Sequence, residues 1–459
     1  MEKSVAGSGN SNTGEVQQLL NADVPSRFID YVVVCTKREE TIGDGSDDPC
    51  NGGRWETKLK VNARFPEEDW DDAPFPNALP LFCLPTTEET VESCLSGGDG
   101  SKDIAANEAL TFPFVLTQAD GSHVFGTCLL HAVANGEGEE RASEALCIVS
   151  KWPMFSLFES CLRWSHDVAF KAESWGSVQA LRVVEEFFSK LVALVLPPTA
   201  LRVQINLKSD GLATVQESIG RDRIGHSLPL VDHSCYYVLA DHFDEDNIVH
   251  ILESMIMEQK ILIHGEVLGD ITKISEALLS LLYPLQWPFV YIPLVPPSLV
   301  DYLHAPLPFV MGIHSSNFLM ESVIPVMPQC VVVNLDQKVV IDPMQLRPLP
   351  GAKTWNREND TETIPSFPPE LSAAVKSHLK NAIRTIRNRS EAPAQSIVDE
   401  AVRVMRSAGL SLIISLLHGA SECMKAPPVA GGGVAMPPAA GKYLTPTSSC
   451  TSSFWTERT

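Results

Sequence analysis

The chain has 459 residues, which is enough for two or three domains, and its 44% hydrophobic and 20% charged content is ordinary for a globular protein. Its formal net charge of −22 repels nucleic acids and anionic lipid surfaces, which excludes a general role in binding DNA or RNA. The 11 cysteines form no Cys-x-x-Cys pair, which favours reduced thiols in a cytoplasmic protein over a disulfide framework or a zinc site.

The first 200 residues predict a sheet backed by helices. Residues 1–25 are rich in Ser, Gly and Asn, so we expect disorder there, and no apolar segment indicates a secretory signal. Asp120-Gly121 lies between two strand-like halves and predicts a hairpin turn. The expected strands lie at 28–36, 59–65, 112–131 (the hairpin) and 145–150, and the expected helices at 155–168 and 178–196.

The second half predicts parallel βαβ units, because four short apolar runs are separated by connections long enough to carry helices. Asp244 or Asp246 is expected to cap the first of these helices and Ser298 to cap a later one, whereas "HSSNF" is expected to be a loop. The expected strands lie at 260–265, 288–293, 308–313 and 330–336, and the expected helices at 244–259, 271–283 and 298–305.

The most apolar stretch, "LLSLLYPLQWPFVYIPLVPPSL" at 278–299, is long enough to cross a membrane. Its five prolines argue against a spanning helix, because each removes a backbone donor that nothing in lipid replaces. We therefore expect no transmembrane segment here, but the end of a helix, a strand and the start of another helix, all buried in protein.

Two amphipathic helices are expected at 368–388 and 394–418, before a Pro/Gly/Ala/Ser-rich tail that we expect to be disordered. One face of the first helix carries Lys376, Lys380, Arg384 and Arg387. Such a basic stripe is more often a solvated face beside a core stripe than a dock for lipid headgroups or an acidic partner. Both interpretations stay open, and with them a transient association with membranes.

Motifs of covalent catalysis are missing from the sequence. Gly441-Lys442 lacks the glycine and the Ser/Thr of a phosphate-binding loop, no Gly-x-Ser-x-Gly is present, and the adjacent Ser165, His166 and Asp167 cannot fold back into a triad. No Cys or carboxylate spacing near the histidines supports a metal. We therefore expect no catalytic residue, no metal and no cofactor.

Ordered motifs in both halves resemble the DENN-domain family, regulators of Rab-type small GTPases. In the central module these are "ILESMIMEQKILIHG", "ALLSLLYPLQWPFVYIPLVP" and "LHAPLPFVMGIHSSNF", and in the upstream module "FPNALPLFCLP", "FPFVLTQADGSHVFGTCLLH" and "LCIVSKWPMFSLFESCL". The downstream module is matched more weakly, by "FPPEL" and the two helices, and Gln259 stands where the family usually has a basic residue.

The resemblance implies a two-lobed α/β fold. A longin-like N-terminal lobe of sheet and helices would be followed by an α/β C-terminal lobe with a mainly parallel sheet and trailing helices, and a GTPase would be held between the lobes. The expected divisions are a disordered 1–25, a uDENN longin-like lobe at 26–200, a cDENN α/β module at 201–345, a dDENN-like helical module at 346–422 and a disordered tail at 423–459.

The resemblance also implies a function, which composition alone does not. Family members commonly act as guanine nucleotide exchange factors for Rab GTPases in vesicle trafficking, without covalent catalysis, so we expect a cytoplasmic protein that is peripheral on vesicle membranes. A non-catalytic scaffold that binds a GTPase equally in all nucleotide states is the alternative. A GTPase-activating protein of the longin-DENN type would need an arginine finger, for which Arg221 and Arg223 are available.

The partner-binding residues are expected from topology, because open α/β sheets bind ligands in the crevice beyond the carboxyl ends of their strands. A histidine at such a position is more often a structural hydrogen-bonding residue than a ligand, and Gly312 could simply allow close packing. The expected residues are His264, Gly265, Pro293, Gly312, His314, Ser315, Asn317 and Asp336.

Overall fold

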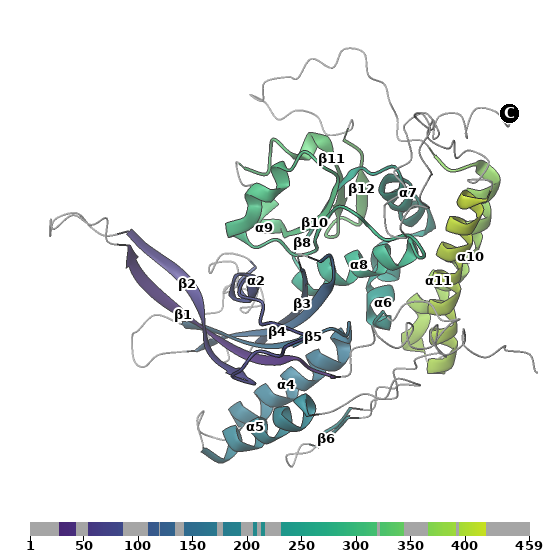
Figure 1. Cartoon of the computed structure of the whole chain (residues 1–459). Coiled ribbons are helices and arrows are strands. Elements are labelled where there is room, and N and C mark those ends of the chain that lie inside the picture. The colour runs from purple at the N-terminus through teal and green to yellow at the C-terminus, as the bar shows by residue number, and fades with distance from the viewer. Residues whose placement is uncertain are drawn as a thin grey trace, which may run out of the picture.

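The computed structural model describes residues 27–42, 54–85, 109–118, 120–133, 142–171, 178–193, 205–208, 213–215, 231–318, 322–343, 366–391 and 394–418. The segments expected to be disordered, 1–25 and 423–459, lie outside these residues, as do Arg221 and Arg223. The described parts form two α/β lobes and a pair of trailing helices (Figure 1).

The first lobe is a five-stranded antiparallel sheet in the order β2-β1-β5-β4-β3, and it confirms the expected strands and hairpin. Its strands are β1 Tyr31–Ile42, β2 Arg54–Phe65, β3 Ala109–Thr117, β4 His123–Val133 and β5 Ala142–Ser150. The β3–β4 turn contains Gly121 at φ 84, a left-handed conformation that glycine adopts without strain.

Alternation along the strands gives this sheet two buried faces. One face, with Val32, Leu129 and Ile148, packs against helices α4 Phe155–Lys171 and α5 Val178–Val192, which confirms the two expected helices. The other face, with Val33 and Val149, packs against the short helix α2 Leu79–Phe82 and the second lobe. A small pair, β6 Ile205–Lys208 and β7 Ala213–Val215, follows.

The second lobe has a sheet in the order β12-β11-β8-β10-β9, in which β8 to β11 run parallel and β12 is antiparallel. The four parallel strands confirm the expected βαβ units. The elements are α6 His233–His242, α7 Glu245–Ile256, β8 Lys260–Gly265, α8 Leu268–Leu281, β9 Val290–Ile292, η1 Pro297–His304, β10 Phe309–His314, α9 Ser315–Phe318, η2 Met327–Gln329, β11 Cys330–Asn334 and β12 Val339–Ile341.

Two local expectations in this lobe were wrong. The segment after Pro296 is a 3-10 helix that begins at Pro297 without a side-chain cap, so Ser298 does not cap it. "HSSNF" is not a loop, because Ser315 to Phe318 form the short helix α9 at the end of β10. Asp244 does cap α7, since its side chain accepts a hydrogen bond from the Asn247 backbone N–H.

The apolar stretch at 278–299 is the end of α8, the strand β9 and the start of η1, as its prolines predicted. Among the helices of the described residues, none is both long and apolar enough to cross a membrane. The stretch is buried at 281–282 and 293–296, but residues 284–286 and 288 between them are exposed, so the expectation that all of it is buried was wrong for the segment after α8.

Helix α8 joins the two lobes, lying between the two sheets (Figure 1). The Thr272 hydroxyl donates to the Pro113 carbonyl of β3 at 2.8 Å, and Lys273 pairs with Glu159 of α4 at 2.8 Å. On β9, the Tyr291 carbonyl accepts from the Thr117 hydroxyl at 3.1 Å. One hydrophobic cluster continues from the first sheet through α8 to the second, so the lobes are fixed against each other.

The trailing helices, α10 Pro369–Arg387 and α11 Gln395–Leu417, confirm both expected amphipathic helices. The basic stripe of α10 lies along α7, where Lys376 pairs with Asp246 at 2.7 Å and Lys380 with Glu245 at 3.2 Å. Arg387 donates from Nε to the Ala240 carbonyl at 2.6 Å. Much of the stripe is therefore engaged within the protein, which favours its structural interpretation.

Candidate functional site

The carboxyl ends of three parallel strands meet at one edge of the second sheet. In register, His264 of β8 lies opposite Ile313 of β10 and Asn334 of β11, and Gly265 lies opposite His314. Asp336 follows β11 and Ser315 begins α9, so both come to the same edge. The topology therefore brings five of the predicted residues to one edge of the sheet. We call this edge, with His264, Gly265, His314, Ser315 and Asp336, the strand edge.

The strand edge is held by a short chain of hydrogen bonds. The Ser315 hydroxyl donates to Oδ2 of Asp336 and lies 3.0 Å from Nδ1 of His264, while Oδ1 of Asp336 accepts the Glu266 backbone N–H at 2.8 Å. Because the serine proton points to the carboxylate, the Nδ1–H of His264 is the donor to Ser315. This direction is the reverse of a nucleophilic triad, in which the histidine takes the serine proton.

Burial favours the neutral form of both histidines of the strand edge. It lowers the pKa of His264 to about 4, and the His264 ring stacks on Phe318 with centroids 3.9 Å apart. Burial also lowers the pKa of His314, whose Nδ1 lies 2.8 Å from the Ser316 hydroxyl and whose Nε2 lies 3.0 Å from the Glu266 carbonyl. With three of their four ring nitrogens engaged by protein groups, these histidines serve as structural residues.

Exposure divides the eight predicted residues. His264, Gly265, Pro293, Gly312, His314 and Asn317 are buried, whereas Ser315 is half-buried and Asp336 is exposed. Glu266, Val267 and Ser316, which the sequence did not single out, are exposed at the same edge, and Val267 keeps 58% of its surface open. A β-branched residue two positions after the strand-end Gly265 is the sequence signal that could have pointed to Val267.

Two of the buried residues connect the strand edge to its surroundings. The Asn317 amide donates to the Pro85 carbonyl at 3.5 Å, which links α9 to the segment after α2 in the first lobe. The Gly312 carbonyl accepts the Val295 backbone N–H at 2.7 Å, just beyond Pro293. The strand edge therefore adjoins both lobes.

Gly312 is fixed by close packing. A Cβ atom there would lie 2.1 Å from the Pro293 carbonyl oxygen and 2.4 Å from Cγ2 of Ile271, so backbone would have to move. We expect Gly312→Ala to lower the free energy of unfolding by about 2 kcal/mol, as overpacking of a core does. Gly269→Ala is the matched control, because the nearest atom to its Cβ would be 3.7 Å away, and it should be neutral or stabilising. Urea unfolding of both variants checks this, and equal losses would contradict it.

These features define a two-lobed α/β protein. The hydrogen bonds of its strand edge have a structural role and do not form a proton-transfer site. The uDENN domain model matches residues 59–131 and the DENN (AEX-3) domain model matches residues 141–338. The two matched ranges follow one another through both sheets, and the chain belongs to the DENN family.

Individual proteins that are similar to this chain are also DENN domain-containing proteins. The chain is 28% identical over 348 residues to the DENN domain and WD repeat-containing protein SCD1 of Arabidopsis thaliana, which covers 73% of this chain and 28% of the relative. It is 27% identical to DENN domain-containing protein 1A of Mus musculus over 329 residues, with 71% and 27% covered. For DENN domain-containing protein 2A of Homo sapiens the identity is 27% over 336 residues, with 73% and 29% covered. The matches thus span less than a third of each relative's length.

Proposed function

We propose that the chain is a guanine nucleotide exchange factor that promotes GDP release from a Rab-family small GTPase. The observation that carries the proposal is the ordered match of the uDENN and DENN domain models across both lobes, since members of this family generally act on Rab GTPases. An exchange factor needs a surface that binds the nucleotide-free GTPase more tightly than the GDP-bound form. By linkage it then weakens GDP binding by the same factor.

The arrangement of the strand edge is compatible with such a surface. Exchange needs no covalent chemistry in this chain, and the neutral histidines and the Ser315–Asp336 contact supply rigidity rather than reactivity. A shift from 1:99 to 99:1 between two states takes about 5.5 kcal/mol of differential affinity, which a signalling interface of about 2,000 Å² can supply. Of the eight predicted residues, Ser315 and Asp336 remain proposed GTPase contacts, with the exposed Glu266, Val267 and Ser316 added to them, and we propose that the six buried residues support this surface from within.

The junction of the lobes is filled by α8, so we place the partner at the rim of this junction rather than inside it. There, the strand edge adjoins Pro85 of the first lobe through Asn317. Glu266 and Asp336 are exposed acids at this edge, and they fit a partner whose matching surface is basic. Action on vesicle trafficking, at the cytoplasmic face of a membrane, is part of the same proposal.

Release of a fluorescent GDP analogue from a panel of purified Rab proteins tests the function. We expect the chain to accelerate release from at least one member by about tenfold or more, a change of about 1.4 kcal/mol in activation free energy. Val267→Asp places a charge on the proposed contact surface and should abolish most of the acceleration. Ile414→Asp on α11 is the matched control, because Ile414 is 57% exposed against 58% for Val267, and it should leave the rate unchanged.

Two results would contradict the proposal. Folded protein that accelerates release from no member of the panel, yet binds a Rab equally with GDP, with GTP and without nucleotide, would identify a scaffold instead. Equal rates for the Val267→Asp variant and the unaltered chain would remove the strand edge from the proposed interface.

A further inference from the structure

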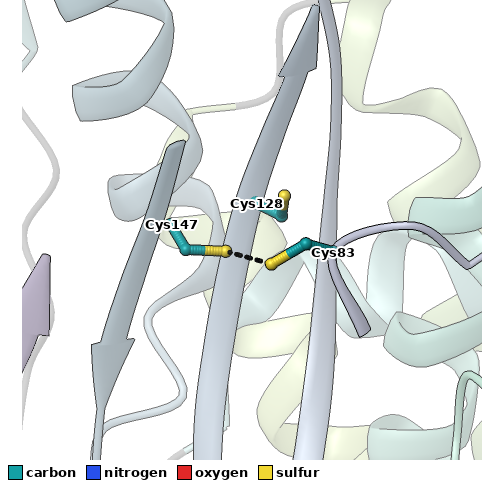
Figure 2. Close-up of side chains that lie close together, drawn as sticks. All are labelled: Cys83, Cys128 and Cys147. Atoms are coloured by element: carbon teal, nitrogen blue, oxygen red, sulfur yellow. Dashed lines mark hydrogen bonds between the residues drawn. The ribbon is translucent and has the colours of Figure 1, made fainter. Parts of the chain in front are cut away.

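Three buried thiols converge in the core of the first lobe. Cys83 directly follows α2, Cys128 lies on β4 and Cys147 lies on β5, and Figure 2 shows the sulfur atoms of Cys83 and Cys147 pointing toward one another with Cys128 beside them. The Sγ atoms of Cys83 and Cys147 are 3.4 Å apart, and all three sulfur atoms lie within 4.8 Å of one another. None of the three residues exposes any surface, so solvent does not reach the cluster.

Strand register explains the convergence. Cys128 pairs directly with Cys147, and a directly opposed pair places its side chains side by side on one face. Cys35 of β1 lies opposite Ala145, two residues before Cys147, so it lies on the same face one strand further along. Cys83, which directly follows α2, belongs to the same buried cluster as Cys35. Four separate segments of the chain therefore contribute one thiol each.

We propose that Cys35, Cys83, Cys128 and Cys147 form a closed four-thiolate site for a zinc-type divalent ion. A tetrahedral zinc site has Zn–S bonds of about 2.3 Å, which places its sulfur atoms about 3.8 Å apart. The sulfur separations of the cluster begin at 3.4 Å and extend to at most 4.8 Å among the three closest thiols, a span that includes this value. The Sγ atom of Cys35 lies outside this group of three, so its side chain would have to move toward them to complete the four-thiolate site.

A cysteine binds a zinc-type ion as a thiolate, so each thiol of the cluster must lose its proton when the ion binds. On binding, each sulfur releases its proton to solvent and donates an electron pair to the ion, with no change of oxidation state. Occupancy must therefore fall as the pH falls. Because the cluster is inaccessible in the folded chain, the ion enters while the sheet assembles.

The position of the ion would matter for the fold. It would tie α2, a helix of four residues, to three strands of the first sheet. The segment that follows Cys83 reaches Pro85, whose carbonyl accepts the Asn317 amide beside the strand edge. The ion thus fastens the part of the first lobe that adjoins the second. This inference does not depend on the proposed exchange activity.

Metal analysis of the full chain, expressed with zinc in the medium and passed through a chelating column, tests the proposal. We expect about one zinc ion per chain, and cobalt-grown protein should show the thiolate charge-transfer and visible bands of tetrahedral Co²⁺. Cys147→Ala should lose the metal and the bands. Cys330→Ala, which removes a buried thiol of another cluster, is the matched control and should keep both.

Metal analysis of the unaltered chain tests the proposed zinc site even if a cysteine variant does not fold. Zinc-grown and cobalt-grown protein that carries no metal, with every thiol free on denaturation, would show that the cluster is apolar core packing and would overturn the proposal. A Cys83–Cys147 disulfide in protein prepared without reductant would also overturn it. Metal retained by Cys147→Ala at the level of the unaltered chain would place the ion elsewhere.

Discussion

Replacing Lys273 by methionine is expected to lower the free energy of unfolding by about 3–5 kcal/mol, the cost of leaving one partner of a buried ion pair alone. Nζ of Lys273 on α8 lies 2.8 Å from Oε1 of Glu159 on α4, with side-chain exposures of 12% and 17%. Burial raises the pKa of Glu159, and Lys273 opposes that rise. Methionine keeps the length of the side chain but leaves the carboxylate without its cation at the junction of the lobes.

The matched control is Lys190→Met on α5. Lys190 also lies 2.7 Å from a glutamate, Glu186, but the two side chains are 73% and 68% exposed. Exposed pairs of this kind contribute at most about 1 kcal/mol, because water screens them. Chemical denaturation followed by circular dichroism measures both variants.

A second replacement separates charge burial from lost packing. In the double variant Lys273→Met/Glu159→Leu no charge is left unpaired, so a large part of the lost stability should return. If the single Lys273 variant loses no more than the Lys190 variant, the pair does not hold the lobes together.

Local pattern accounts for most of the fold that could be predicted from the sequence. Apolar runs of four to seven residues between turn signals became β8, β10 and β11, and the amphipathic spacing around Ile248 and Leu252 became α7. Such elements bury a face that the sequence itself displays. The parallel direction of these strands could be predicted because the connections between them are long enough to carry helices, whereas their order in the sheet was not predicted.

The elements that were missed or mistaken depend on tertiary contacts. Helix α6 is capped by Asp232, whose carboxylate also accepts from the Ser156 backbone and hydroxyl of α4, so its start is fixed by the first lobe. Ser315 begins α9 while its hydroxyl contacts Asp336, which follows β11. Neither contact leaves a periodic signal in the chain.

The same distinction between local pattern and tertiary contacts applies to the candidate site. The rule that ligands bind beyond strand ends brought His264, His314, Ser315 and Asp336 to one edge, where the structure places them. It could not distinguish exposed from buried members, because exposure depends on what packs above the strand ends. The thiol cluster was missed for a related reason, since its cysteines come from separate segments that only strand register brings together.

Between pH 4.5 and 8, the unaltered chain is expected to lose about 3 kcal/mol of stability relative to its Glu276→Gln variant. Burial raises the pKa of Glu276 from 4.5 to about 7, while the Tyr291 hydroxyl, which donates to Oε1 at 2.5 Å, partly opposes the rise. The unfolded chain releases this proton first as the pH rises, so stability falls from pH 4.5 to about pH 7 and is then constant. A shift of this size corresponds to about 3 kcal/mol.

Stability falls here as the pH rises, whereas a salt-bridged carboxylate makes stability rise with pH. Two further variants test the role of the Tyr291 hydrogen bond. Tyr291→Phe removes the hydrogen bond that lowers the pKa of Glu276, so the loss of stability should extend to higher pH. Tyr302→Phe is the matched control, because that ring is 55% exposed, and its stability should follow that of the unaltered chain at every pH. Urea unfolding at several pH values compares them. Parallel stability curves for the Glu276→Gln variant and the unaltered chain would show that Glu276 is ionised in the folded protein as readily as in the unfolded one.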